Sequence, residues 1–226
     1  MPSKKSCAAR KNCYREYVAV DPSGLRARKK EQTRIALSWA TIRLAVERGL
    51  ANVRVEDIAA EVGVSPRTFN NYFASKGEAI ADRELERFRQ FAAALRERPA
   101  GEPLWPAITA AVLDRYALAD ETGDSAGVDE TARRRWVEGV RLMIAEPSVQ
   151  RDLAVAYAAA EQQLAAAVAA RTGTDVDRDM FPRLVAGAVG VALGTARQQW
   201  LRDQSVPIAD LLRDALAQVA GGLAVP

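Results

Sequence analysis

The chain has 226 residues, of which 49% are apolar, and a formal net charge of +3. This length suits one or two compact domains with a sizeable core. No stretch of 18 uncharged apolar residues occurs, and the basic N-terminus lacks the apolar segment of a signal peptide, so we expect a cytoplasmic protein without a membrane span. Abundant alanine, short β-branched runs and helical periodicity predict an all-α fold.

The positive charge is concentrated in the N-terminal part. Residues 1–90 hold 18 Lys and Arg against 11 Asp and Glu, whereas residues 91–226 hold 14 against 18. A basic part joined to an acidic remainder indicates that the first part meets a polyanion. We divide the chain into a basic flexible arm at 1–24, a first helical domain at 25–75 and a larger helical domain at 76–226.

The arm carries five basic residues and both cysteines, Cys7 and Cys13. Two cysteines in a chain without histidine cannot complete a zinc site, so no metal site or cofactor is expected. A reduced exposed pair and a redox switch are both left open. The arm itself is either a solubilising tail or a segment that contacts phosphates or a minor groove.

Four helices are expected in the first 96 residues. The first covers about 25–48 and ends at Gly49, a residue suited to a left-handed C-terminal position. The second covers 55–62, and the third runs from about 66 to 72 after a serine N-cap and a proline at the first helical position. Ser75 and Glu78 form a capping box for the fourth, which continues to about Arg96.

Five further helices are punctuated by prolines and glycines. Their expected ranges are about 103–118, 129–145, 148–171, 177–202 and 207–220.

The second and third helices match a helix-turn-helix unit. Ala59 is small enough for a close crossing, and Gly63 turns the chain without a Cβ penalty. Apolar side chains at 58, 62, 64, 69 and 73 would fix the crossing angle. The polar residues that remain on the third helix are Arg67, Thr68, Asn70 and Asn71.

These polar residue types suit DNA recognition. Arginine pairs with guanine O6 and N7, and asparagine pairs with adenine N6 and N7. Tyr72 and Lys76 follow where the chain would leave a groove, which fits phosphate contacts. The alternative is a surface helical hairpin with a solvated polar face, and the Ser-Pro start, the small-residue spacing and the basic flank favour the DNA-binding interpretation.

The run from Glu31 to Ile80 resembles the N-terminal domain of the TetR family of bacterial transcriptional regulators. The residues that carry the resemblance are Gly49, the run VEDIAAEVGVS at 55–65, Phe69, Tyr72, Phe73, Ser75 and Lys76.

The resemblance implies a homodimer whose paired recognition helices enter successive major grooves of a palindromic operator in double-stranded DNA. By position, Pro66, Arg67 and Asn70 would face bases, whereas Thr68, Tyr72 and Lys76 would hold phosphates. Asn71 is left open between a phosphate and water.

Two departures from the family pattern matter. Arg54 stands where the family usually has a threonine that caps a helix and contacts phosphate. Arginine can reach a phosphate but cannot cap, so Asn52 is expected to share the capping. Asn70 stands where the family commonly has tyrosine, so no operator can be borrowed by analogy.

The larger domain is expected to dimerise and to bind a ligand. Two C-terminal helices would form half of a four-helix dimer interface, with ordinary packing inside one subunit as the alternative; the residues are Gly187, Gly190, Gly194, Leu211, Leu212 and Leu216. Large or polar side chains on alanine-rich faces predict a pocket for a small apolar effector, with Arg141 at an anionic head group. Ordinary core packing of these side chains is the alternative. Fatty acyl-CoA-type ligands are one option among many in the family. The expected lining is Trp105, Tyr116, Trp136, Arg141, Met143 and Tyr157.

Enzymatic chemistry is not expected. The G-x-S-x-G pattern at 123–127 has no preceding strand, and the chain has no histidine to act as a base. The aspartates at 175, 177 and 179 lack the glycine and glutamate of a calcium loop, so they are interpreted as an acidic helix start. The sequence therefore predicts a ligand-responsive repressor, and the alternative is an all-α small-molecule-binding protein or enzyme with an incidental helix-turn-helix.

Overall fold

The computed structural model describes residues 22–122 and 130–223. The two cysteines, the arm before residue 22 and the motif at 123–127 lie outside these residues. The described part is helical without strands, which confirms the predicted all-α class.

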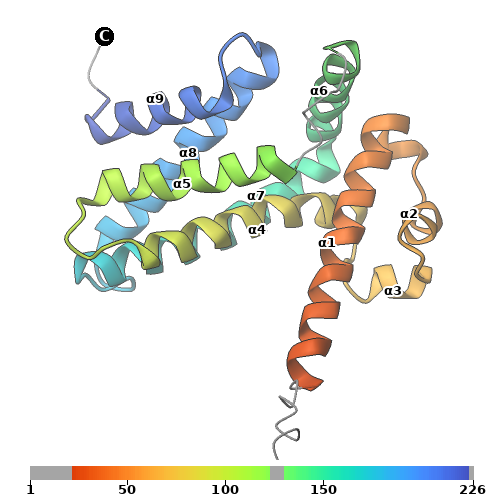
Figure 1. Ribbon diagram of the computed structural model, residues 1–226, viewed down its shortest axis with the longest axis horizontal. Helices are drawn as coiled ribbons and strands as arrows, with labels where there is room; N and C mark the ends of the chain where they lie inside the picture. The colour runs from red at the N-terminus through yellow and green to blue at the C-terminus, as the bar shows by residue number, and fades with distance from the viewer. Residues whose placement is uncertain (1–21, 123–129, 224–226) are drawn as a thin grey trace, which may run out of the picture.

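The N-terminal helices form a small head (Figure 1). Its elements are α1 (Pro22–Arg48), η1 (Leu50–Asn52), α2 (Val55–Val62) and α3 (Pro66–Asn70). The long helix α1 packs against α2, and α2 packs against α3. The lower half of α1 extends past α3, away from the rest of the molecule.

The remaining helices form a larger body. They are α4 (Lys76–Glu97), α5 (Leu104–Thr122), α6 (Glu130–Ala145), α7 (Pro147–Thr172), α8 (Met180–Arg202) and α9 (Ile208–Ala220). Helix α4 starts in the head and lies along α7 through the body, and α8 packs on both α7 and α9. Helix α6 stands against the C-terminal half of α1. Both α4 and α6 therefore connect the body to the head.

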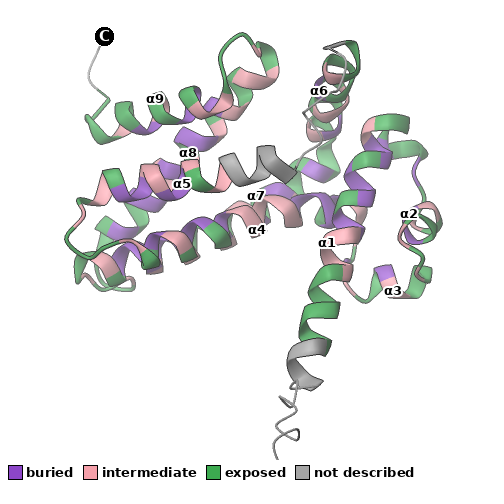
Figure 2. Cartoon of the chain, in the orientation of Figure 1, coloured by how far each residue is buried: buried purple, intermediate pink, exposed green. Residues whose placement is uncertain are grey.

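In the described part of the chain, three clusters of buried side chains hold these helices together. Figure 2 colours the buried residues of each helix purple. The head is built around Leu37, Ile58, Phe69 and Phe73. A second cluster, which includes Ile42 and Met143, joins α1, α4, α6 and α7. The largest fills the body between α4, α5, α7, α8 and α9. Because the second cluster spans head and body, the two parts do not pack independently.

Helix α7 is long and apolar enough to cross a membrane by length and composition alone. In this fold it is the central helix of the body, and its buried side chains include Leu153, Leu164 and Val168. The apolar character of α7 is thus explained by core packing.

The helix ends differ from expectation by two residues or more at four places. Helix α1 begins at Pro22 instead of about 25, and α5 ends at Thr122 instead of about 118. Helix α3 ends at Asn70, two residues early, because the amides of Asn71 and Tyr72 bond in tight turns to carbonyls of α3. Helix α8 begins at Met180 instead of 177. Before it, Asp175 accepts the amides of Asp177 and Arg178 and donates its own amide to Asp179, so the aspartates form a turn that precedes the helix.

Candidate nucleic-acid interface

The corner between α2 and α3 is shaped by local sequence. Gly63 adopts φ 73° and ψ 32°, the left-handed conformation that glycine tolerates best. The amide of Val64 then donates to the carbonyl of Ala59 at 2.9 Å, which closes the end of α2. Ser65 accepts the amide of Thr68 at 3.1 Å and caps α3, directly before Pro66. These bonds set the direction in which α3 leaves the corner.

The inner side of α3 is anchored in the head core. Phe69 is 1% exposed, and its ring centroid lies 5.7 Å from that of Phe73. Ile58 of α2 and Leu37 of α1 belong to the same cluster, and Val62 and Val64 pack against it. The predicted apolar wedge is therefore confirmed, and it leaves α3 with one fixed outer side.

Four of the predicted DNA-binding side chains lie on that outer side. Pro66, Arg67, Asn70 and Asn71 are exposed. Thr68 is partly buried, and its hydroxyl lies 2.9 Å from the hydroxyl of Ser65. An outer side with a guanidinium and amide groups can donate to and accept from base edges.

The start of α2 shows how Arg54 is accommodated. The Arg54 side chain is exposed and makes no capping hydrogen bond. Instead, the carboxylate of Asp57 accepts the backbone amide of Arg54 at 2.9 Å. The expectation for Asn52 is wrong, because its side-chain amide donates to the carbonyl of Arg48 and so caps the end of α1. The guanidinium of Arg54 remains available to a phosphate.

Tyr72 and Lys76 lie where the chain turns from α3 into α4. Tyr72 is half-buried against Phe73, with ring centroids 6.3 Å apart. The Lys76 ammonium donates to the carbonyls of Leu50 at 2.7 Å and Val53 at 2.6 Å. An ammonium has three N–H donors, so Lys76 ties two segments of the head together and keeps one donor for a phosphate.

Two segments of the chain match models of known protein families. Residues 39–81 match the model of the tetR family of bacterial regulatory proteins, and residues 102–224 match the model of the MftR C-terminal domain. The chain belongs to the TetR family. As a member it is a transcriptional regulator and not an enzyme.

Two curated relatives of the TetR-family chain agree with this assignment. It is 35% identical over 184 residues to the transcriptional regulator TcmR of Streptomyces glaucescens, covering 79% of this chain and 78% of the relative. It is 32% identical over 197 residues to MftR of Mycobacterium tuberculosis, whose name refers to mycofactocin biosynthesis; the match covers 87% and 93%.

Solved structures share the fold of this TetR-family chain. A TetR-family regulator from Syntrophomonas wolfei has a TM-score of 0.58 at 17% identity, covering 86% of this chain and 98% of the other. The fatty acid degradation regulator FadR of Bacillus halodurans has a TM-score of 0.54 at 15% identity, covering 86% and 97%.

The residues predicted to line a ligand pocket do not come together as a set. Trp136 and Arg141 of α6 are exposed, and Arg141 pairs with Glu138 at 2.7 Å. Met143 is buried in the core shared by head and body. Trp105 lines a separate groove between α5 and α9. The expectation of one shared pocket with Arg141 at its anionic end is therefore wrong. Helical periodicity identifies the apolar faces of helices, but it does not show which faces pack against each other.

Two of the six, Tyr116 and Tyr157, meet at a charged cluster inside the body. Glu84 of α4 pairs with Arg87 at 2.9 Å and with Arg197 of α8 at 2.8 Å. The Arg87 guanidinium lies 5.0 Å from the centroid of the Tyr116 ring. Arg197 lies over the ring of Tyr157 and donates to its hydroxyl. We call Glu84, Arg87, Tyr116, Tyr157 and Arg197 the bundle cluster.

Sequence reasoning missed the three charged members of the bundle cluster. Glu84 and Arg87 are three residues apart on α4, which resembles an ordinary surface pair. Arg197 lies in the run RQQW, which looks equally solvated. The apolar residues around positions 84–88 and 189–196 were the available signal, since they predict burial on both sides of these charges.

Burial and pairing shift the pKa values in the bundle cluster. Burial opposes the ionisation of Glu84, but the guanidiniums of Arg87 and Arg197 outweigh it and lower the pKa of Glu84. Burial raises the pKa of Tyr157 to about 12, and the nearby Glu84 carboxylate adds to this effect. Burial also raises the pKa of Tyr116. The cluster therefore holds two cations, one anion and two neutral tyrosines.

The predicted dimer residues fall into two groups. Leu211, Leu212 and Leu216 are buried in the core of one subunit, so the expectation that they meet a second subunit is wrong for these side chains. Gly187, Gly190 and Gly194 are partly exposed and border a hollow of about 240 Å³ between α7 and α8. Beside them on α8, Leu184 and Val191 are 66% and 69% exposed.

Proposed function

We propose that this regulator binds a palindromic operator as a homodimer and represses transcription in the bacterial cytoplasm until a small ligand releases it. The observation that carries the proposal is the exposed pair Arg67 and Asn70 on a helix whose inner side, at Phe69, is buried. Two such helices, related by a two-fold axis and about 34 Å apart, would enter successive major grooves.

The roles of the exposed side chains follow from their chemistry. Arg67 would pair with guanine and Asn70 with adenine, and Pro66 would make an apolar contact with a base edge. The remaining side chains would hold phosphates and fix the register without selecting a sequence. They are Arg54, Thr68, Asn71, Tyr72 and Lys76.

The outer face of α8 supports the homodimer. Phe181, Leu184 and Val191 are exposed apolar side chains, and Leu184 and Val191 share one helix face. The glycines at 187, 190 and 194 lie beside them, and small residues allow helices to approach closely. Large apolar side chains exposed together on one helix face are typical of an interaction site. A two-fold axis would pair this face with its own copy.

We propose that the effector binds at the bundle cluster. Arg87 and Arg197 supply two guanidiniums for one carboxylate, which leaves positive charge for an anionic head group. Phe91, stacked on Tyr116 at 5.9 Å, and Phe88, 6.0 Å from Tyr157, supply an apolar wall. The ligand class is therefore apolar with an anionic group, and a fatty acyl-CoA is one member of this class.

Helix α4 offers a direct path from the bundle cluster to the head. Lys76 begins α4 and is bonded to the head, and Glu84 lies about two turns further along the same helix. The hollow beside Tyr157, about 240 Å³, is smaller than usual ligand pockets of roughly 300–1,000 Å³. Ligand entry would then move α4 relative to α8 and change the separation of the recognition helices.

The test is selection of bound DNA from a random pool, repeated with cell metabolites added. We expect a palindromic consensus that native protein binds in a salt-sensitive manner and that a metabolite fraction abolishes. Asn70→Ala should cost about 1–3 kcal/mol of discrimination at one base pair. Asn71→Ala is the matched control and should leave the consensus unchanged. Recovery of no consensus would refute the proposal.

A further inference from the structure

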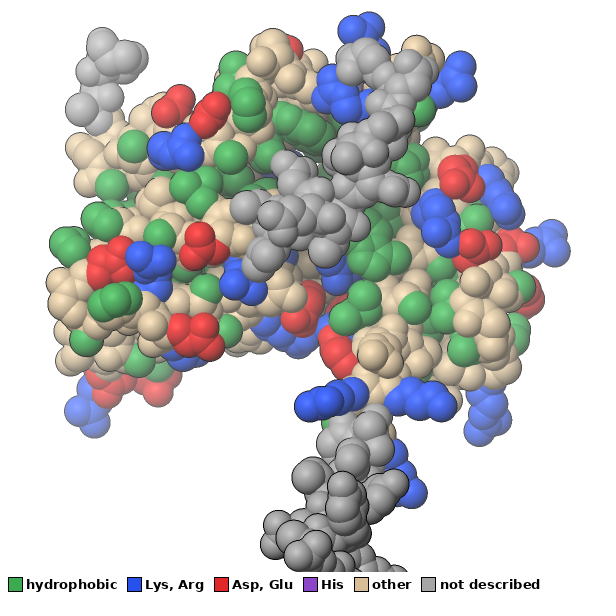
Figure 3. Space-filling model, viewed as in Figure 1, with side chains coloured by type: hydrophobic (Ala, Val, Ile, Leu, Met, Phe, Trp, Pro, Cys, Tyr) green, Lys and Arg blue, Asp and Glu red, His purple; other side chains and the backbone are tan. Residues whose placement is uncertain are grey.

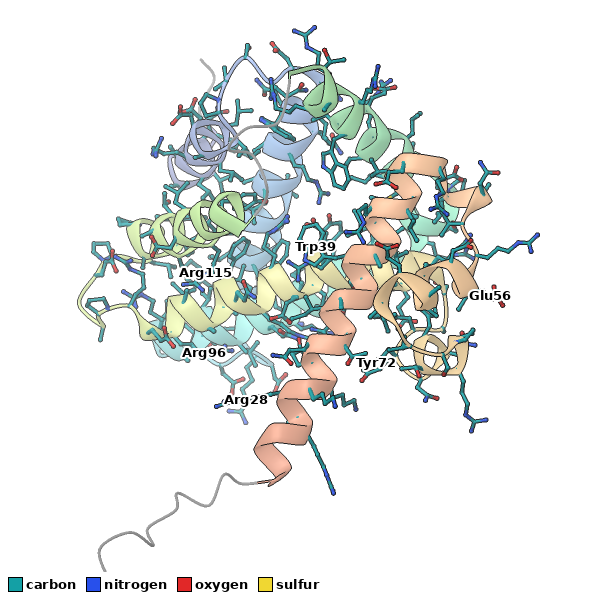
Figure 4. The ribbon with its side chains drawn as sticks, turned by 45° about the vertical axis from the view of Figure 1, so that its right-hand side comes forward. Arg28, Trp39, Glu56, Tyr72, Arg96 and Arg115 are labelled. Carbon is teal, nitrogen blue, oxygen red and sulfur yellow. The ribbon has the colours of Figure 1, made fainter. Side chains whose placement is uncertain are left out.

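Residues 26–32 of α1 form a basic projection that packs against no other helix in the described part of the chain. Residues 26–32 are all exposed, and the first buried side chain that follows them on α1 is Leu37. Figure 4 shows Arg28 on this lower half of α1, below the level of Tyr72 in the view. We call residues 26–32 the α1 extension.

Four cations of the α1 extension have no acidic partner among the residues that the structure describes. Arg26, Arg28, Lys29 and Lys30 make no ion pair with any residue in 22–122 or 130–223. The acidic residue within the α1 extension, Glu31, accepts hydrogen bonds from Arg34 at 2.6 Å and 3.0 Å. In Figure 3, Lys and Arg side chains gather on the lower side of the head and along α1.

This charge pattern opposes helix formation in the free protein. Like charges three and four residues apart, as at Arg26, Lys29 and Lys30, repel one another on a helix surface. Positive charge near a helix N-terminus also opposes the helix dipole. An exposed helical segment this short gains nothing from packing. A polyanion alongside would remove the repulsion, so the segment is suited to a phosphate backbone.

The position of the α1 extension suits the same DNA as α3. It extends beyond α3 on the side of the head that faces away from the body. The tetR-family match begins at residue 39, so the extension lies ahead of the segment that the family model covers. Seven residues of helix span about 10 Å, enough to follow the duplex past the part that α3 contacts.

We infer that the α1 extension binds phosphates that flank each operator half-site, independently of sequence. This inference rests on the proposed operator binding by α3. Each phosphate contact adds about 0.9 to the steepness with which log affinity falls with log salt. The extension would therefore raise affinity and salt sensitivity without changing the preferred sequence.

The test compares native protein with the variant Arg26→Gln/Arg28→Gln/Lys29→Gln/Lys30→Gln. Affinity for the selected operator is measured by fluorescence anisotropy between about 50 and 300 mM salt. Two duplexes are used: one ends flush with the half-sites, and one carries about one extra helical turn on each side. On the longer duplex we expect the variant to lose about 2–4 units of salt slope per subunit and to bind at least about tenfold more weakly at low salt.

The flush duplex should show a much smaller difference, and the consensus should stay the same. The charge-matched control is Arg96→Gln/Arg178→Gln/Arg202→Gln/Arg213→Gln, whose four exposed residues lie in the body. An unchanged slope in the extension variant, or an equal loss in the control, would overturn the inference while leaving operator binding intact. If native protein selects no operator, the proposed function fails first, and the inference fails with it.

Discussion

The ammonium of Lys76 donates a hydrogen bond of 2.6 Å to the carbonyl oxygen of Val53. A second bond, to Leu50, fixes the same loop to the start of α4. The two carbonyls belong to the short segment between α1 and α2, so Lys76 links the helix-turn-helix to the helix that enters the body. A residue expected to hold only a phosphate thus also holds the head to α4.

Replacement of Lys76 by alanine should therefore lower stability as well as DNA affinity. Loss of a charged donor to two carbonyls is expected to reduce the free energy of unfolding by about 1–3 kcal/mol. DNA binding should weaken across all sequences, because the contact does not select a base. Chemical denaturation and binding to specific and random duplexes would measure both effects.

Arg54→Ala is the control for this change. Arg54 is exposed and makes no side-chain capping bond, so its loss should weaken DNA binding while the free energy of unfolding stays within about 0.5 kcal/mol of native. If Lys76→Ala unfolds at the native midpoint, the linking role is wrong.

The contrast between Ser65 and Arg197 shows what the sequence could predict. Ser65 and Pro66 mark the start of α3 within two residues. The bounds of α2 and the exposed side chains of α3 were likewise predicted from residues close in sequence. Arg197 acts through Glu84, 113 positions earlier, and periodicity cannot identify a partner at that distance. The same limit explains the wrong expectation for Leu212. The apolar stripe of its helix was predicted correctly, but Leu212 packs inside its own subunit.

Gly139 of α6 lies against Val46 of α1 at a contact between body and head. A Cβ at position 139 would lie 2.6 Å from the Val46 Cγ1 and 2.8 Å from the Val46 carbonyl oxygen. Gly139→Ala should therefore push α6 away from α1 and cost about 1–3 kcal/mol of stability. Thermal unfolding measures the cost, and operator binding measures the effect on the head.

The control for this substitution is Gly101→Ala, at a glycine outside the contact between α1 and α6. An added Cβ at Gly101 meets no atom within 4 Å, and its φ is not in the left-handed region. It should leave both unfolding and operator binding at native values. A Gly139→Ala protein as stable as the Gly101→Ala protein would show that the α1–α6 contact can relax without loss.

Leu184 on the outer face of α8 tests the proposed dimer. Its side chain is 66% exposed in one subunit, so Leu184→Glu should leave the subunit folded. In a two-fold dimer the two new carboxylates would face each other, and like charges at an interface cost several kcal/mol. We expect a dissociation constant at least about 100-fold higher, measured by sedimentation velocity.

Leu142→Glu is the control for the dimer experiment. Leu142 lies on a different helix, α6, and is 60% exposed, so the same chemical change should leave the association state unaltered. A native-like dimer for Leu184→Glu would place the dimer contact elsewhere on the molecule.

Tyr157 should report the electrostatics of the bundle cluster at high pH. Its pKa is raised to about 12 by burial and by the nearby Glu84 carboxylate, whereas an unfolded tyrosine has a pKa of about 10. The folded state therefore keeps a proton that the unfolded state loses between these two values. The stability that this group contributes is fully present below pH 10 and is lost as the pH rises through about 12.

Tyr157→Phe should remove this dependence. A difference of about two pKa units corresponds to roughly 2–3 kcal/mol, so the variant should lose less unfolding free energy than native protein between about pH 10 and 12. Tyrosinate absorbance of the folded protein should lose a component that titrates near pH 12 in Tyr157→Phe, while Tyr72→Phe, a change in the head, should retain it. If the component lost from Tyr157→Phe titrates near pH 10, Tyr157 is not held neutral by burial, and the bundle cluster is open to water.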